Sequence, residues 1–207
     1  MRTSLSTMCL LIGMGASFSS YAADDQVSCK RFVDTMQSRA DTIFHDTAMG
    51  FSQKQSALSG LFEEGVDIAW VAQYVAGSNW NTASEKERAD FVKAYRAYLS
   101  NRYIGALDED DISGFKDFTL VDFTSSPPNA YQAHIEITQK ADQPVSVDLR
   151  MELESKSGCR VHDFTLEGVS LLQNQSEQIQ SLAANGGLIN VTQKLMELVH
   201  RSHETSQ

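Results

Sequence analysis

The sequence lacks the motifs by which most enzyme active sites are recognised. It contains no G-x-S-x-G elbow, no H-E-x-x-H zinc motif and no glycine-rich phosphate loop. Beyond residue 22, no segment approaches the ~20 consecutive apolar residues that a membrane-spanning helix needs. Only three prolines occur, and neither a low-complexity linker nor an internal repeat is visible. These absences argue against a motif-bearing enzyme and favour one domain.

Positive charge is also scarce. The chain has 17 Lys and Arg residues against 27 Asp and Glu residues, which gives a formal net charge of −10. Binding to nucleic acid depends on neutralising phosphates with Lys and Arg, and unaided adhesion to anionic lipid surfaces depends on the same cations. We therefore expect no nucleic-acid partner, and we interpret the acidic surface as one that favours solubility.

The N-terminus predicts a secretory signal over residues 1–22. Arg2 precedes the apolar run MCLLIGMGASF, and small residues at Ser20 and Ala22 favour cleavage after Ala22. Cys9 lies at the start of the apolar run rather than at its end, which argues against a lipoprotein anchor. We expect a mature domain of residues 23–207 that is exported.

Two cysteines remain after this cleavage, Cys29 and Cys159. In an oxidising compartment, an even pair of cysteines favours a disulfide. Two separate buried thiols are the alternative, because the sequence does not give the distance between the two Cα atoms.

The N-terminal half shows helical periodicity. Apolar residues recur at helical spacing from Cys29 to Ile43, which places Cys29 on the buried face. A short helix is expected over 57–62, and another follows over 68–76, where Gly77 can end it.

The clearest helix signal lies in the segment 84–107. Ser84 and Glu87 form a capping box at its start. An apolar stripe then recurs every fourth residue and predicts an amphipathic helix; its members are Phe91, Tyr95, Leu99 and Tyr103.

From about Phe115 the apolar period changes from helical to two. Strands are expected over 118–125, 131–140 and 145–154, and a last strand should start at Cys159. In the first of these strands, Val121 and Phe123 should lie on one face. The turns between them are short, which favours an antiparallel meander with one wet face.

The last strand and the C-terminus complete the predicted fold. The apolar parity shifts between Val161 and Phe164, which predicts a bulge near Asp163. Two helices should follow, over 171–185 and 190–200. Helices first and a curled antiparallel sheet second predict an α+β domain.

Candidates for catalysis or metal binding are few. His162 and Asp163 are adjacent, but neighbouring strand residues point to opposite faces, so we expect them not to share a site. His200 and His203 lie about one helical turn apart, and a solvated C-terminal helix explains them better than a metal does. We expect no catalytic residue, no cofactor and no metal.

Two separated segments resemble a known family. The first is IAWVAQYVAGSNWNTASEKERADFVKAYRAYLSNRY, and the second is CRVHDFTLEGVSLLQN. These two segments occur in the same order as in the MlaC, or toluene-tolerance auxiliary, family and follow a predicted signal segment. They are similar to that family, whose members are periplasmic phospholipid-binding components of ABC transport systems. The likeness covers about residues 61–178.

This resemblance implies a fold and a function. The fold is a cone like that of nuclear transport factor 2, with N-terminal helices packed on a curled sheet and a cavity that takes phospholipid acyl chains. Such carriers pass lipid between an outer-membrane lipoprotein–porin complex and an inner-membrane ABC transporter with an MCE-domain subunit, and so maintain outer-membrane lipid asymmetry. The lipid-binding residues expected on this basis are Val71, Val75, Phe91, Tyr95, Leu99, Tyr103, Val147, Leu149, Met151 and Val169.

The chain departs from the family pattern at three points. Cys159 stands where the family has Trp ahead of the last strand, so a Cys29–Cys159 bridge would clamp that strand in place of an indole. Gln175 and Ser176 replace a Tyr-Arg pair. The acidic charge is also unexpected if docking to the transport complexes relies on positive surface.

Two other functions stay open. A similar cone hosts isomerases and dehydratases that act on small apolar substrates, and such an enzyme would need an ionisable residue at an inward strand position. The inward positions of the strand 145–154 are apolar, which counts against it. The other alternative is an interaction domain with a closed core and no ligand.

Overall fold

The computed structural model describes residues 19–126, 129–140, 143–154 and 158–205, and for 19–24 and 203–205 it describes the backbone alone. The predicted signal segment lies largely outside this range, so its cleavage stays a prediction. Within the described residues, no helix is both long enough and apolar enough to cross a membrane.

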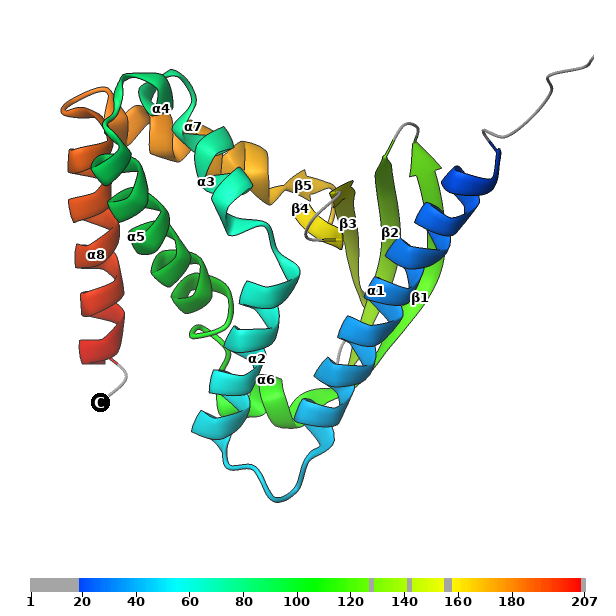
Figure 1. Ribbon diagram of the computed structural model, residues 1–207. Coiled ribbons are helices and arrows are strands. Elements are labelled where there is room, and N and C mark those ends of the chain that lie inside the picture. Colours follow the sequence, from blue (N-terminus) through cyan, green and yellow to red (C-terminus); the bar gives the residue numbers. More distant parts are fainter. Residues whose placement is uncertain (1–18, 127–128, 141–142, 155–157, 206–207) are drawn as a thin grey trace, which may run out of the picture.

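Helices come first along the chain and the sheet second (Figure 1). The first six helices are α1 (Ser19–His45), α2 (Phe51–Gly65), α3 (Ile68–Ala76), α4 (Ser78–Thr82), α5 (Glu85–Tyr103) and α6 (Glu109–Gly114). They are followed by β1 (Phe115–Ser126), β2 (Ala130–Gln139), β3 (Val145–Glu154), β4 (Gly158–Leu166), β5 (Val169–Ser170), α7 (Leu171–Ala183) and α8 (Gly187–Thr205).

The strands form one sheet in the order β1-β2-β3-β4-β5, and each pair of neighbours is antiparallel. The predicted α+β class and the antiparallel meander are confirmed. The sheet is curled and open, with β1 at one edge and the short β5 at the other (Figure 1).

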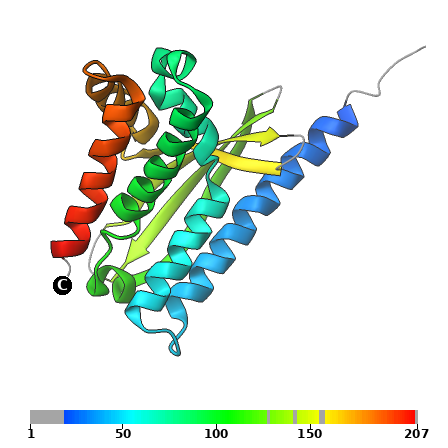
Figure 2. The same cartoon turned by 60° about the vertical axis from the view of Figure 1, so that its left-hand side comes forward.

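The long helices form a row, in which α8 packs on α5, α5 on α2 and α2 on α1. Figure 2 shows these four helices as roughly parallel rods. At one end of the row α1 lies across the sheet and contacts β1 to β4, whereas α7 and α3 pack on β4. The other end of the row, α5 and α8, stands away from the long strands in Figure 1.

Local sequence explains α5 and α3. Glu87 accepts a hydrogen bond from the Ser84 backbone N–H at 2.6 Å, and the Ser84 hydroxyl accepts one from the Glu87 N–H, so the predicted capping box is present. The helix α3 ends at Gly77, whose φ of 56° suits a residue without a side chain.

Two helices are longer than the sequence suggested. The helix α2 begins at Phe51 rather than near Ala57. The sequence did not reveal this start, because the first turns are largely polar and the N-cap, Gly50, has no capping side chain. The helix α8 begins directly at Gly187, and the two glycines 186 and 187, which both have positive φ, make the tight turn from α7.

Two bulges set which side chains face inward. In β4, Arg150 pairs with Asp163 but Met151 pairs with Val161, so His162 is the extra residue and the predicted bulge near Asp163 is confirmed. In β1 the register skips Val121, which is exposed while Phe123 is half-buried. The expected alternation of Val121 and Phe123 on one face is therefore wrong.

A disulfide joins Cys29 on α1 to Cys159 on β4, with 5.2 Å between their Cα atoms. Of the two alternatives for these cysteines, the bridge is thus the one present. Both residues are buried, and they belong to a hydrophobic cluster that also takes in side chains from α3, α5, α7, α8, β2 and β3. The bridge ties the long N-terminal helix to the strand that carries the bulge.

Candidate functional site

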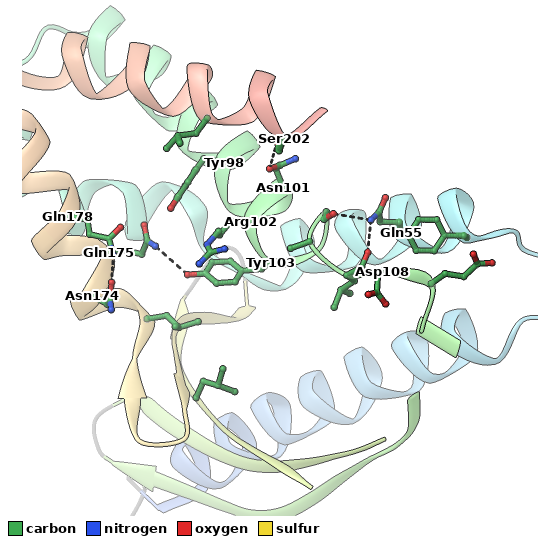
Figure 3. Close-up of a pocket in the computed structure, with 18 residues that line it drawn as sticks. Gln55, Tyr98, Asn101, Arg102, Tyr103, Asp108, Asn174, Gln175, Gln178 and Ser202 are labelled. Atoms are coloured by element: carbon green, nitrogen blue, oxygen red, sulfur yellow. Dashed lines mark hydrogen bonds between the residues drawn. The ribbon is translucent and has the colours of Figure 1, made fainter. Parts of the chain in front are cut away.

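An open groove lies between the C-terminal half of α5, the loop that follows it, α7 and α8 (Figure 3). Its volume is about 1110 Å³, slightly above the usual range for ligand pockets, which ends at about 1000 Å³. Polar and apolar side chains share the lining, which includes Gln55, Tyr98, Asn101, Arg102, Leu107, Asp108, Leu166, Leu171, Asn174, Gln178, Leu198 and Ser202.

The groove is lined by side chains of both charge signs. Arg102, in the last turn of α5, is the single Lys or Arg among the described residues that line it, and Asp108 and Glu109 also line it. Because the guanidinium is exposed and carries five donors, it can bind an anionic oxygen group at the mouth of the groove.

A much smaller pocket lies deeper in the fold, with a volume of about 30 Å³. Its lining is almost wholly apolar and comes from α2, α3, α5, β4 and α7: Phe62, Val66, Val71, Tyr95, Leu99, Tyr103, His162, Asp163, Phe164, Leu171, Leu172 and Gln175. At this size the pocket admits about one water and no acyl chain.

Three residues line both spaces, namely Tyr103, Leu171 and Gln175. The Gln175 side-chain N–H donates a hydrogen bond to the Tyr103 hydroxyl at 3.4 Å, and Figure 3 shows the two side chains pointing toward each other. Burial raises the pKa of Tyr103, and this hydrogen bond partly offsets the rise. The Tyr103–Gln175 pair therefore separates the groove from the inner pocket with one long hydrogen bond.

Three residues that line the inner pocket carry polar atoms with no hydrogen-bond partner among the described residues: the Tyr95 hydroxyl, the Gln175 side-chain oxygen and both ring nitrogens of His162. Burial, together with the neighbouring Tyr103 and Tyr98 hydroxyls, raises the pKa of Tyr95 far above its usual range. Since an unpaired buried hydroxyl costs free energy, these atoms are positions where a ligand or water can bind.

Asp163 positions α7 against the sheet. Its carboxylate accepts hydrogen bonds from the Ser170 hydroxyl at 2.7 Å and from the Leu172 backbone N–H at 2.9 Å. A third bond at 3.3 Å comes from Arg150 on β3. The carboxylate thus accepts hydrogen bonds from donors at the N-terminus of α7, and α7 forms one wall of the groove.

The expectation that His162 and Asp163 face opposite ways is wrong. Both are buried and both line the inner pocket, because the bulge at His162 rotates the chain between them. The ionisable inward strand position that an enzyme would need is therefore present.

The predicted lipid-binding residues fall into three groups. Val71, Tyr95, Leu99 and Tyr103 line the inner pocket. Val75, Phe91 and Met151 are fully buried in the adjoining hydrophobic cluster. Val147 and Leu149 are half-buried on β3, and Val169 is exposed on β5.

Sequence reasoning missed the residues of α7, α8 and the loop 104–109 that line the groove. The apolar face of α7 gave a signal, since Leu172, Gln175 and Ile179 recur at helical spacing and are buried. Gln175 was noted only as a departure from a family pattern.

Fold and site define the class of protein: an α+β protein with an open curled sheet, in which a groove between helices leads to a small apolar pocket. The chain belongs to the MlaC protein family, whose model matches residues 29–197. This confirms the resemblance and extends it beyond residues 61–178 at both ends.

A solved structure shares this fold. The phospholipid-binding protein of Ralstonia solanacearum, in complex with a phospholipid, is 21% identical in sequence, with a TM-score of 0.70. The similarity covers 86% of this chain and 98% of that one. At this identity the likeness concerns the fold. No curated protein matches the chain.

Proposed function

We propose that this protein binds phospholipid and carries it through an aqueous compartment. The observation that carries this proposal is that two spaces adjoin, a groove lined by polar and apolar side chains and an apolar pocket behind the Tyr103–Gln175 pair. Membership of the MlaC family supports it, as does the shared fold with a protein described as phospholipid-binding.

In this proposal the acyl chains lie in the groove, and the end of a chain reaches the inner pocket when Tyr103 and Gln175 move aside. Breaking their hydrogen bond costs about 1 kcal/mol, because such bonds contribute little net free energy. The phosphate then lies at the mouth, where Arg102 and Asn101 supply donors. The polar and apolar parts of a phospholipid are matched by the two ends of the site.

The energetics suit a shuttle. Two acyl chains hold on the order of 30 methylenes, so shielding them from water is worth ~25 kcal/mol gross at ~0.8 kcal/mol each. Inside a bilayer those chains are already dry, so transfer into the protein gains little. The carrier should therefore retain lipid firmly in water and depend on docked partners for loading and release.

The proposal extends to the compartment and the partners of the carrier. The family resemblance and the predicted signal segment support a periplasmic carrier that exchanges lipid with an outer-membrane lipoprotein–porin complex and an inner-membrane ABC transporter bearing an MCE-domain subunit. Its physiological result would be the maintenance of outer-membrane lipid asymmetry.

An enzyme acting on a small apolar substrate is the second candidate, because His162 and Asp163 line the inner pocket. The contacts of Asp163 count against it: one oxygen accepts from the Leu172 N–H, and the other from Ser170 and Arg150. We therefore favour a binding and transport protein.

The test is the variant Leu171→Trp, which places a bulky ring where the groove and the pocket meet. Excluding only two methylenes costs about 1.6 kcal/mol, or roughly a tenfold loss of lipid affinity. Ile189→Trp, at an exposed position of α8, is the control. Both variants should be purified and compared with the parent for bound phospholipid and for melting temperature.

We expect Leu171→Trp to stay folded with little bound lipid, and Ile189→Trp to match the parent in both measurements. If Leu171→Trp binds as much phospholipid as the control does, the lipid does not occupy this site and the proposal fails.

A further inference from the structure

A second cluster of functional groups lies at the junction of α2 and α3, beside β3 and β4. The His162 Nε2 atom is 3.9 Å from an Asp67 carboxylate oxygen and 3.7 Å from a Glu154 carboxylate oxygen. One ligand atom from each of these three residues lies within 4.8 Å of the other two. We propose that Asp67, Glu154 and His162 form a binding site for a divalent transition-metal ion of the zinc type.

The first argument is the state of His162. Its side chain is 2% exposed, and neither ring nitrogen has a hydrogen-bond partner among the described residues. A buried imidazole without partners costs free energy, and at least one nitrogen of a neutral ring is a lone-pair donor suited to a metal. The orphaned nitrogen faces the two carboxylates.

Distances give the second argument. Separations of 3.7 and 3.9 Å are too long for hydrogen bonds. Ligands that bind a tetrahedral zinc ion at about 2.0–2.2 Å stand roughly 3.3–3.5 Å apart. Small rotations of the two carboxylate side chains would bring their oxygens into that range, whereas a hydrogen-bonded ion pair would require a larger approach.

The surroundings of the imidazole support the same geometry. The Trp70 indole stacks on the His162 ring with 4.0 Å between centroids and an interplanar angle of 14°. This stacking covers a ring face and leaves the in-plane nitrogens available. Glu152 lies 3.9 Å from Nδ1, so a small rotation of its side chain would let it accept the Nδ1 proton and keep the Nε2 lone pair directed at the metal.

The elements that carry the ligands are held in place independently. One Asp67 oxygen accepts a hydrogen bond from the Trp70 backbone N–H, which caps α3, and the other oxygen faces His162. The Asp67 N–H donates to the Val161 carbonyl at 3.0 Å, beside the β4 bulge. A metal ion would tie the α2–α3 junction to both strands, near the Cys29–Cys159 bridge.

This site gives no sequence motif, because its three ligands come from a helix cap, the end of β3 and a bulge in β4. Three protein ligands leave a fourth position for water. Its ligands lie apart from the groove lining, and only His162 among them also lines the inner pocket. Metal binding is measured without lipid, so its test is separate from that of the lipid-binding proposal.

The test uses the full mature chain, stripped with chelator and then titrated with Zn²⁺ or with Co²⁺. Zinc at about 100 times its Kd should raise the melting temperature by about 5–10 °C. Cobalt should give the visible absorption of a tetrahedral complex. Asp67→Asn, which keeps the cap acceptor, and Glu154→Gln should each weaken both responses at least about tenfold.

Controls are Glu177→Gln and His200→Gln, which remove an exposed acid on α7 and an exposed imidazole on α8. Both should leave the zinc shift and the cobalt spectrum unchanged. If zinc does not move the melting temperature and cobalt gives no absorption, the metal site does not exist. Equal losses in the control variants would overturn it as well.

Discussion

At the scale of single residues, the inner pocket is marked by buried polar atoms that have no hydrogen-bond partner among the described residues. The Tyr95 hydroxyl is buried and has no hydrogen-bond partner among the described residues. An unsatisfied buried group of this kind costs about 1–3 kcal/mol, which a folded protein tolerates where the group serves a ligand. Tyr95 is therefore a candidate contact for the polar ester region of a bound lipid.

Tyr95→Phe tests this role. In lipid-free protein the change removes an unpaired hydroxyl and keeps the ring, so the free energy of unfolding should be unchanged or higher by up to about 1–2 kcal/mol. In lipid-loaded protein the variant should hold phospholipid less tightly. Urea unfolding of both forms measures the difference, and a lipid-free variant less stable than the parent would contradict the account.

The parent and the Tyr95→Phe variant should also differ in how their unfolding free energy depends on pH above about pH 10. Burial raises the pKa of Tyr95, whereas in the unfolded chain tyrosine titrates near ~10. The folded pKa lies above the unfolded one, so the stability of the neutral phenol is fully present below about pH 10 and is lost as the pH rises further. Between about pH 10 and 11, the unfolding free energy should fall less steeply in Tyr95→Phe. Equal slopes would show that Tyr95 is not protected by burial.

At the scale of elements, the fold depends on how two helices are fixed to β4. The helix α1 is attached by the Cys29–Cys159 disulfide, and α7 by the hydrogen bonds that Asp163 accepts. Both attachments lie on the strand that also holds His162. The position of the groove wall therefore depends on β4 more than on any other strand.

The disulfide gives the element-scale prediction. It links residues 130 apart in sequence, and closing so long a loop is worth about 4–5 kcal/mol in the chain-entropy model. The double variant Cys29→Ala with Cys159→Ala should therefore melt about 10 °C or more below the parent. Alkylation of the purified protein without reductant should label neither thiol, and rapid labelling of both under native, oxidised conditions would contradict the bridge.

Elements were predictable where their signals are local. The capping box of Ser84 and Glu87 and the stripe after it identify α5, and the parity shift between Val161 and Phe164 locates the β4 bulge. The start of α2 was missed because Gly50 carries no capping side chain and the first turns are polar. In β1, the bulge at Val121 reversed the expected faces, since no residue in the strand marks it.

At the scale of the whole molecule, the groove could not be predicted from periodicity. Its walls come from α5, α7 and α8, which are brought together only by tertiary packing. The inner pocket was partly predicted, because the apolar stripe of α5 already indicates Tyr95 and Leu99. The cluster of Asp67, Glu154 and His162 is invisible in sequence, since each ligand comes from a different element.

The account also predicts how the molecule handles its cargo as a whole. The net charge of −10 should disfavour unaided contact with anionic membranes, whatever lipid the groove and the pocket behind it bind under the proposed function. Lipid exchange with bare anionic vesicles should accordingly be slow.

The most direct measurement of the central claim is the lipid content of the protein purified from the cell envelope. Native mass spectrometry, followed by solvent extraction, reports whether a small molecule is bound and identifies it. The carrier account predicts a stoichiometric amount of phospholipid that stays bound through purification in water. A chain that carries no phospholipid and takes none up from detergent-solubilised lipid would contradict the account and leave a closed-core interaction domain in its place.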